Sequence, residues 1–133
     1  MMRAMIATSI YQKEAASMDM RRRLGNAGEQ IAETMLKKKG YKILKRQYQI
    51  RFGEIDLIAL DGDEVVFIEV KTRHASEGPF PEESVGEKKL RRMEITAEHF
   101  LKAQAFESRD YRFDVIAITL TAGEPEIVHL VGV

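Results

Sequence analysis

Between positions 24 and 40, apolar residues recur at intervals of three and four, the spacing of one face of a helix. The stripe comprises Leu24, Gly28, Ile31, Ala32, Met35 and Leu36. Gly40 follows the stripe and suits a helix C-terminus, where glycine adopts a left-handed conformation at no steric cost. The pattern predicts an amphipathic helix that ends at Gly40.

The spacing then changes to that of β-strands. Residues 41–51 alternate roughly between apolar and polar, whereas residues 53–61 and 64–73 carry apolar side chains on both faces, which is typical of covered strands. Gly62 and Asp63 are tight-turn residues, so the latter two segments are expected to form an antiparallel hairpin. Residues 111–120 and 126–133 read as two further strands.

A second helix is expected after a loop at residues 74–83. Ser84 and Glu87 have the spacing of a capping box. The apolar side of this helix comprises Val85, Met93, Ala97, Phe100 and Leu101. The order of elements is therefore helix, three strands, helix and two strands, which favours an α/β fold with a mixed central sheet flanked by helices.

Length and composition limit the class of protein. A chain of 133 residues forms one domain, predicted here as residues 21–133, with residues 1–20 as a flexible extension. Cysteine is absent, which excludes disulfides and thiolate metal sites and suits the cytoplasm. No apolar segment approaches membrane-spanning length, so no membrane association is expected.

Basic and acidic residues balance, at 21 each, but they are unevenly distributed. Lysine and arginine recur from Lys37 to Arg51 without an acid, and "KKLRR" follows at residues 88–92. Charge runs are usually solvated faces, and lysines at a helix C-terminus also complement its dipole. Zero net charge predicts weak intrinsic affinity for nucleic acid, because phosphate contacts dominate such binding.

The predicted hairpin carries charges where apolar side chains are expected. Asp56 shares a face with Ile58 in the first strand, with Ile55 and Leu57 opposite, and Glu69 and Lys71 share a face in the second. A two-residue turn flanked by Asp61 and Glu64 would place Asp56 directly opposite Glu69. Adjacent carboxylates in a covered sheet repel, and a divalent cation such as Mg²⁺ is their natural complement. An ion network without chemistry accounts for the same three residues nearly as well.

Asp56 followed by Glu69-Val70-Lys71 matches the PD-(D/E)xK nuclease signature, in its form with a bare aspartate before ExK. The blocks "GNAGEQIAE", "GEIDLIA", "VVFIEVKTR" and "YRFDVIAI" resemble those of the bacterial YraN-type family of predicted endonucleases, distantly related to archaeal Holliday junction resolvases. The likeness runs from about Leu24 to Ile118. It implies a restriction-endonuclease-like fold with core order αβββαβ, and Mg²⁺ or Mn²⁺ as cofactor.

The helices add two further site residues. The resemblance implies an acid on the first helix at the "GE" of residues 28–29, and Glu29 lies nearer the apolar stripe than Glu33. A solvated boundary glutamate is the alternative. Lys89 falls in the apolar register of the second helix, whereas Lys88, Arg91 and Arg92 point away from it. We assign Lys89 to the rim of the site, contacting phosphate or a site carboxylate, with snorkelling as the alternative.

Arginines complete the predicted nucleic-acid-binding set. Arg73 shares the Glu69 face at the end of its strand, and Arg46 and Arg51 approach the same end of the sheet, although surface solvation explains these last two equally well. Asp114, within an apolar strand, is read as structural, with Arg112 or a helix residue as its partner, and the three histidines are read as structural or surface residues. Three aromatic residues near the site, Tyr48, Phe52 and Phe80, are expected to pack in the core or anchor loops rather than to stack on bases.

The leading hypothesis is a metal-dependent endonuclease that acts on DNA. Asp56, Glu69 and Glu29 would hold the metal, and Lys71 would assist the attack of water on phosphorus. Branched DNA is suggested by the kinship with junction resolvases, and cutting both strands symmetrically would need a homodimer. The alternative is a non-catalytic nucleic-acid-binding or scaffolding module that retains the nuclease fold.

Overall fold

The structure is a computed structural model that describes residues 2–78 and 86–133, with side chains outside residues 2–18. Its elements in chain order are α1 (Met2–Lys38), β1 (Lys42–Ile50), β2 (Gly53–Asp61), β3 (Glu64–His74), the 3₁₀ turn η1 (Ala75–Glu77), α2 (Glu87–Ala103), β4 (Tyr111–Leu120) and β5 (Glu126–Leu130). This is the predicted order of helix, three strands, helix and two strands.

The strands of the described residues form one sheet in the order β1-β2-β3-β4-β5. β3 and β4 are parallel, and the other neighbours are antiparallel. Parallel neighbours need a crossover connection, and here that connection carries α2. The sheet is therefore mixed, as predicted, and the architecture is compatible with a restriction-endonuclease-like fold.

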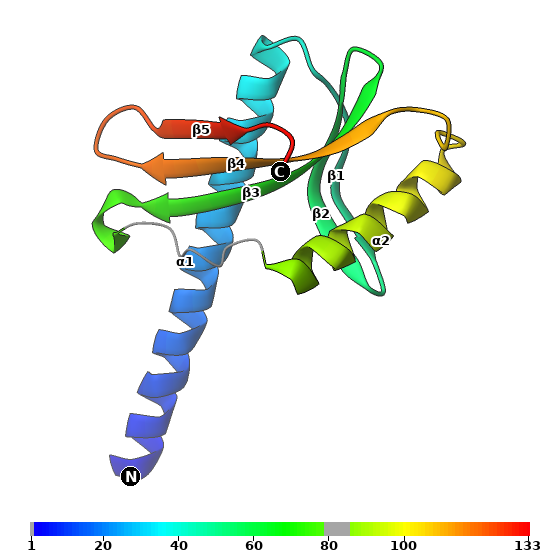
Figure 1. The fold of residues 1–133 in the computed structure, drawn as a ribbon. Helices are drawn as coiled ribbons and strands as arrows, with labels where there is room; N and C mark the ends of the chain where they lie inside the picture. Colours follow the sequence, from blue (N-terminus) through cyan, green and yellow to red (C-terminus); the bar gives the residue numbers. More distant parts are fainter. Residues whose placement is uncertain (1, 79–85) are drawn as a thin grey trace.

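The two helices cover opposite faces of the sheet (Figure 1). Ala32 and Leu36 of α1 pack on a buried cluster of alternating strand residues that comprises Leu57, Ala59, Val66, Ile68, Ile116 and Ile118. On the other face, α2 packs on a cluster that comprises Ile55, Ile58, Val65, Phe67, Ala97, Phe100 and Leu101. Strands with apolar residues on both faces are thus covered on both sides, as the sequence predicted.

Helix α1 is longer than the sequence pattern predicts. It begins at Met2 rather than near Leu24, and its N-terminal part projects beyond the sheet (Figure 1). The predicted end is confirmed, because Lys38 is the last helical residue and Gly40 has a φ of 91°. The flexibility of residues 1–20 stays a prediction. Ser84, proposed in the capping box of α2, and Val85 and Phe80 lie outside the described residues.

The β2–β3 hairpin has the predicted register over most of its length. Asp61 lies opposite Glu64, with Gly62 in a left-handed conformation at φ 61°, and pairing continues to Leu57 opposite Ile68. One expectation was wrong: Ile55 belongs to the α2 face and not to the face of Leu57. The cause is a break in the alternation of side chains near Asp56, which the neighbouring strand shares.

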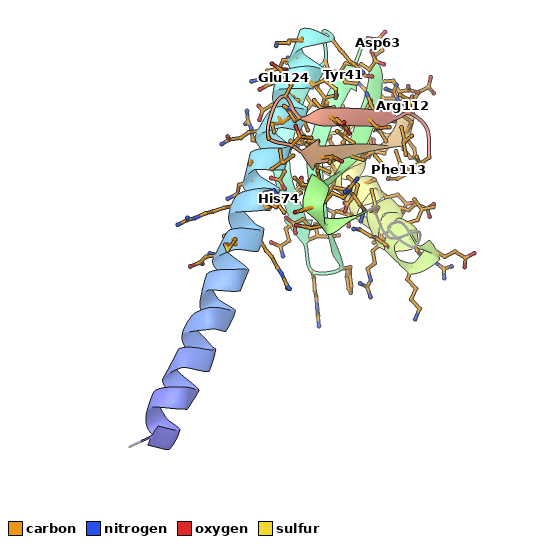
Figure 2. All side chains as sticks on the ribbon, turned by 90° about the vertical axis from the view of Figure 1, so that its left-hand side faces the viewer. Tyr41, Asp63, His74, Arg112, Phe113 and Glu124 are labelled. Atoms are coloured by element: carbon orange, nitrogen blue, oxygen red, sulfur yellow. The ribbon has the colours of Figure 1, made fainter. Side chains whose placement is uncertain are left out.

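A charged cluster lies at the end of the sheet where α1 terminates, around the labelled Arg112 and Tyr41 (Figure 2). The Arg112 guanidinium donates to fully buried Asp114 at 3.0 and 3.2 Å and to the Tyr41 hydroxyl at 2.8 Å. Asp114 also accepts hydrogen bonds from Gly132 N at 3.0 Å and contacts His129 Nε2 at 2.7 Å. Of the two kinds of partner expected for Asp114, the structure shows Arg112, and the contacts of Asp114 are those of a structural residue. No described helix is long and apolar enough to cross a membrane.

Candidate active site

Asp56 lies where strands β2 and β3 part. Regular pairing ends at Leu57 opposite Ile68, and beyond it the Val70 N–H donates to Asp56 Oδ2 at 2.8 Å. On the other side, Asp56 and Gln47 lie between the pairs Arg46–Leu57 and Tyr48–Ile55, and Gln47 has a φ of 48°. The break in the sheet thus turns a carboxylate toward β3 in place of a backbone carbonyl.

Glu69 projects from β3 on the α2 side of the sheet and is only 7% exposed. Two lysines approach its carboxylate. Lys89 Nζ of α2 donates a hydrogen bond to Glu69 Oε1, and Lys71 Nζ, two residues along β3, lies 3.9 Å from the same oxygen. The assignment of Lys89 to a site carboxylate is thereby matched by the contact that the structure makes.

The pKa of Asp56 is strongly shifted by its surroundings. Burial, followed by the negative charge of Glu69, raises the pKa of Asp56 to about 7 from an ordinary 3.8. Burial and the positive charge of Lys89 lower the pKa of Lys71. Burial also acts to lower the pKa of Lys89, but its contacts with Glu69 outweigh it and raise that pKa. The site therefore contains an acid and a base, Asp56 and Lys71, whose pKa values both move toward neutrality.

Glu29 approaches this group from α1. Gln47 Nε2 donates to Glu29 Oε2 at 3.1 Å. Burial raises the pKa of Glu29, the Gln47 hydrogen bond opposes that shift, and the charges of Glu54 and Glu69 add to it. Even so, among residues 19–78 and 86–133, whose side chains the structure describes, no three His, Cys, Asp or Glu side chains converge closely enough to hold a metal. Glu29 as a third metal ligand stays a prediction.

A close helix–sheet contact sets the position of Glu29. Gly28 is buried against β3, and a Cβ atom at that position would lie 1.7 Å from the Thr72 hydroxyl oxygen. Thr72 directly follows Lys71. Only a residue without a side chain lets α1 come this near to β3. In the "GE" pair, Gly28 therefore allows the close contact, and Glu29, the next residue, is brought near the site by it.

The carboxylates open into a cleft of about 590 Å³ between α2 and the β1–β2 hairpin. Asp56, Glu69 and Lys89 line it, together with hairpin residues from Gln49 to Glu54 and with Arg92 and Met93 of α2. Arg92 is exposed, as expected of a residue that points away from the apolar face, and yet it lines the cleft. A helical wheel identifies the face on the core, whereas α2 also borders the hairpin along one flank, which only the tertiary packing reveals.

The predicted phosphate-binding arginines differ in their surroundings. Arg51 lines the cleft. Arg46 instead forms a two-pronged ion pair with Glu33, with Nε 2.8 Å from Oε2. Arg73 Nη1 approaches the carbonyl oxygen of His74 at 3.4 Å. The structure thus brings Arg51 to the carboxylates but not Arg46, and DNA binding by all three arginines stays a prediction.

Comparison with known proteins gives a consistent family assignment. Residues 28–118 match the family described as "Uncharacterised protein family UPF0102". A UPF0102 protein of Caldicellulosiruptor saccharolyticus is 42% identical over 98 residues, covering 74% of this chain and 83% of that protein. One of Syntrophomonas wolfei is 39% identical over 113 residues, covering 85% and 98%. One of Cytophaga hutchinsonii is 46% identical over 109 residues, covering 82% and 93%.

Proposed function

The chain belongs to the uncharacterised protein family UPF0102, and from the geometry of its cleft we propose that it is a metal-dependent endonuclease acting on DNA. One observation carries the proposal. Asp56 and Glu69 are held side by side in a largely buried site, at a cost that shows as a pKa of about 7 for Asp56. A charge arrangement that disfavours its own ionisation is typical of a site built for a ligand of opposite charge.

The donor set fits a hard divalent cation. Mg²⁺ and Mn²⁺ bind to one or two carboxylates and complete their coordination with water and phosphate oxygens, which an open cleft admits. Asp56 and Glu69 would hold the ion, and Glu29 on α1 would be a third ligand. When bound, such an ion polarises a phosphate oxygen and lowers the pKa of a nearby water.

The lysines have separate roles in the proposed reaction. Lys71 accepts the proton of the attacking water, because its lowered pKa increases the fraction of neutral amine at pH 7. Lys89 remains charged against Glu69 and lines the cleft, where it stabilises the negative charge that develops on the phosphate. Arg51 and Arg92, also on the cleft wall, hold neighbouring backbone phosphates.

A non-catalytic nucleic-acid-binding or scaffolding module is the second candidate, favoured by the Lys89–Glu69 ion pair, which neutralises one carboxylate without any metal. Asp56 argues against it. A purely structural network gains nothing from a carboxylate with a raised pKa, since asparagine would accept the same Val70 hydrogen bond without the charge.

The deciding experiment is a cleavage assay. The purified chain is incubated with single-stranded, duplex, flapped and four-way-junction DNA in Mg²⁺ or Mn²⁺, beside RNA of the same sequence. Asp56→Ala and Lys71→Met are expected to lower the cleavage rate at least 100-fold. Asp63→Ala, in the exposed turn of the same hairpin, and Lys45→Met, on β1, are the matched controls and should cut like the parent.

Two results would overturn the proposal. One is the absence of cleavage of every substrate in either metal. The other is cleavage by Asp56→Ala at the parental rate, which would assign the activity to a contaminant or to another site. If both strands of a duplex are cut in one event, light scattering should show a homodimer, because each chain offers a single set of these residues.

A further inference from the structure

Phe52 is an aromatic side chain displayed at the mouth of the cleft. It forms, with Arg51, the two-residue turn that joins β1 to β2, where Ile50 lies opposite Gly53. Its side chain is 63% exposed, although it lines the same cleft as Asp56 and Glu69. The expectation that Phe52 packs in the core or anchors a loop is therefore wrong.

Contacts with α2 hold the turn that carries Phe52 in place. Gly53 lies against α2, and a Cβ atom there would be 2.5 Å from Thr96 Oγ1 and 3.2 Å from the Arg92 carbonyl oxygen. Thr96 itself is buried and donates to that same carbonyl at 2.7 Å. The ring is thus presented on a turn whose next residue is packed against α2, so the backbone that carries it is held against the helix that forms the other side of the cleft.

Cationic side chains lie near the ring, in a cleft that also holds the carboxylates of Glu54, Asp56 and Glu69. The Arg51 guanidinium lies 5.8 Å from the centre of the Phe52 ring, within the range of a cation–π contact. Arg92 and Lys89 line the opposite wall of the cleft. An exposed aromatic face beside an arginine, on a groove lined by further cations, is a combination that holds the bases and backbone of single-stranded nucleic acid.

The other two aromatic residues considered for base stacking do not share this setting. Tyr48 has its ring 5.3 Å from that of Phe100 and its hydroxyl 2.5 Å from His99 Nδ1, so it packs with α2. Phe80 lies outside the described residues. Of the two aromatic residues that the structure describes, Tyr48 and Phe52, it is therefore Phe52 whose side chain is accessible to a ligand.

We propose that Phe52 stacks on an unpaired base beside the phosphate held at Asp56 and Glu69, and that the preferred substrates present such bases. This inference rests on the proposed nuclease function. Bases within an intact duplex expose only their edges in the grooves, so an aromatic face can stack only where a base has left the helix. Flaps, single-stranded segments and branch points supply that base.

The test measures stacking without cleavage. The full chain carries Asp56→Asn, which removes the proposed reaction, and is mixed with a flapped DNA that has 2-aminopurine at the first unpaired position. Stacking changes the fluorescence of this base. Phe52→Ala is expected to abolish the change and to weaken binding of the flapped DNA about tenfold, while binding of uninterrupted duplex stays the same.

Two further variants make the result specific. Phe52→Trp should retain the fluorescence change, because it keeps an aromatic face, and Phe52→Leu should lose it despite being apolar. Tyr111→Ala removes an aromatic ring that is 46% exposed but does not line the cleft, and it should behave as the parent. Melting temperatures of all variants separate loss of stacking from loss of fold.

The failures of the two proposals are distinguishable. Unchanged fluorescence and affinity in Phe52→Ala would overturn the stacking role, whereas parental cleavage in Mg²⁺ would still support the nuclease. Equal weakening of duplex and flapped DNA would also overturn it, since the ring would then act as a general contact. A parent that binds flapped DNA with the expected fluorescence change but cuts nothing would sustain the stacking and overturn the nuclease.

Discussion

Replacing Gly28 by alanine tests the close packing that brings α1 and Glu29 to the site. The added Cβ would lie 1.7 Å from Thr72 Oγ1, 2.8 Å from its Cβ and 3.0 Å from its Cγ2. Ordinary contacts between such atoms are about 3.5–4 Å. Rotating the Thr72 side chain relieves the first overlap but not the second, so α1 must move away from β3.

Gly25 provides a matched control three residues earlier in the same helix. A Cβ at Gly25 meets nothing within 4 Å. Alanine is better than glycine in a helix interior by about 1 kcal/mol, and both variants receive this gain. Gly28→Ala must also bear the overlap with Thr72, and overpacking of a close-packed interior costs roughly 1–3 kcal/mol, occasionally more.

The two substitutions are therefore expected to change the free energy of unfolding in opposite directions. Gly25→Ala should raise the free energy of unfolding by up to about 1 kcal/mol, and Gly28→Ala should lower it by up to about 2 kcal/mol after the helical gain is counted. Urea denaturation followed by circular dichroism at 222 nm measures both, provided that the slope with urea is unchanged. The two melting temperatures should then separate by about 5–10 °C.

A second substitution checks the cause. Thr72→Gly removes the atoms that the new Cβ would strike, so Gly28→Ala should be tolerated better in that background, as a double-mutant cycle would show. A Gly28→Ala variant that is as stable as Gly25→Ala would refute the reasoning, because α1 would then not be in contact with β3 at this residue.

Three further predictions concern charge. Because the pKa of Asp56 is raised to about 7 in the folded chain and is near 3.8 when unfolded, its ionisation costs stability increasingly from pH 4 and fully above pH 7. Asp56→Asn should therefore stabilise the chain against urea at pH 8 and have little effect at pH 4; an equal gain at both would contradict the shift. Calorimetry should find tighter Mn²⁺ binding to the parent at pH 8 than at pH 6, since the metal displaces the Asp56 proton, and no such trend in Asp56→Asn. Asp114→Asn should lower the free energy of unfolding by about 1–3 kcal/mol at pH 7, because Arg112 loses its buried charged partner but keeps its ion pairs with Asp61 and Glu64. The hydrogen bonds from Arg112 and Gly132 overcome burial and hold the pKa of Asp114 low, so this loss should shrink as the pH falls through that pKa, and a loss independent of pH would refute it.

The sequence by itself determined the features that depend on neighbours along the chain. Helical spacing and Gly40 gave the end of α1, and alternation with a Gly62-Asp63 turn gave the register of the β2–β3 hairpin. That register was enough to predict that Asp56 and Glu69 lie next to each other. Local periodicity carries this information because one turn and one strand spacing fix which side chains meet.

Other features depended on contacts between distant segments. Opening of the hairpin at Asp56, which moves Ile55 to the α2 face, accompanies a left-handed Gln47 on a different strand. Arg92 reaches the cleft only because α2 lies along the β1–β2 hairpin, and Phe52 remains exposed only because nothing described covers that turn.

The physical reason for this division is range. Helical hydrogen bonds, tight turns and the alternation of strand side chains act between residues a few positions apart, and the sequence displays them directly. Burial and electrostatic coupling act across whatever folding brings together. The raised pKa of Asp56 needs the desolvation and the neighbouring carboxylates that the packed sheet and helices create, so the tertiary structure alone decided it.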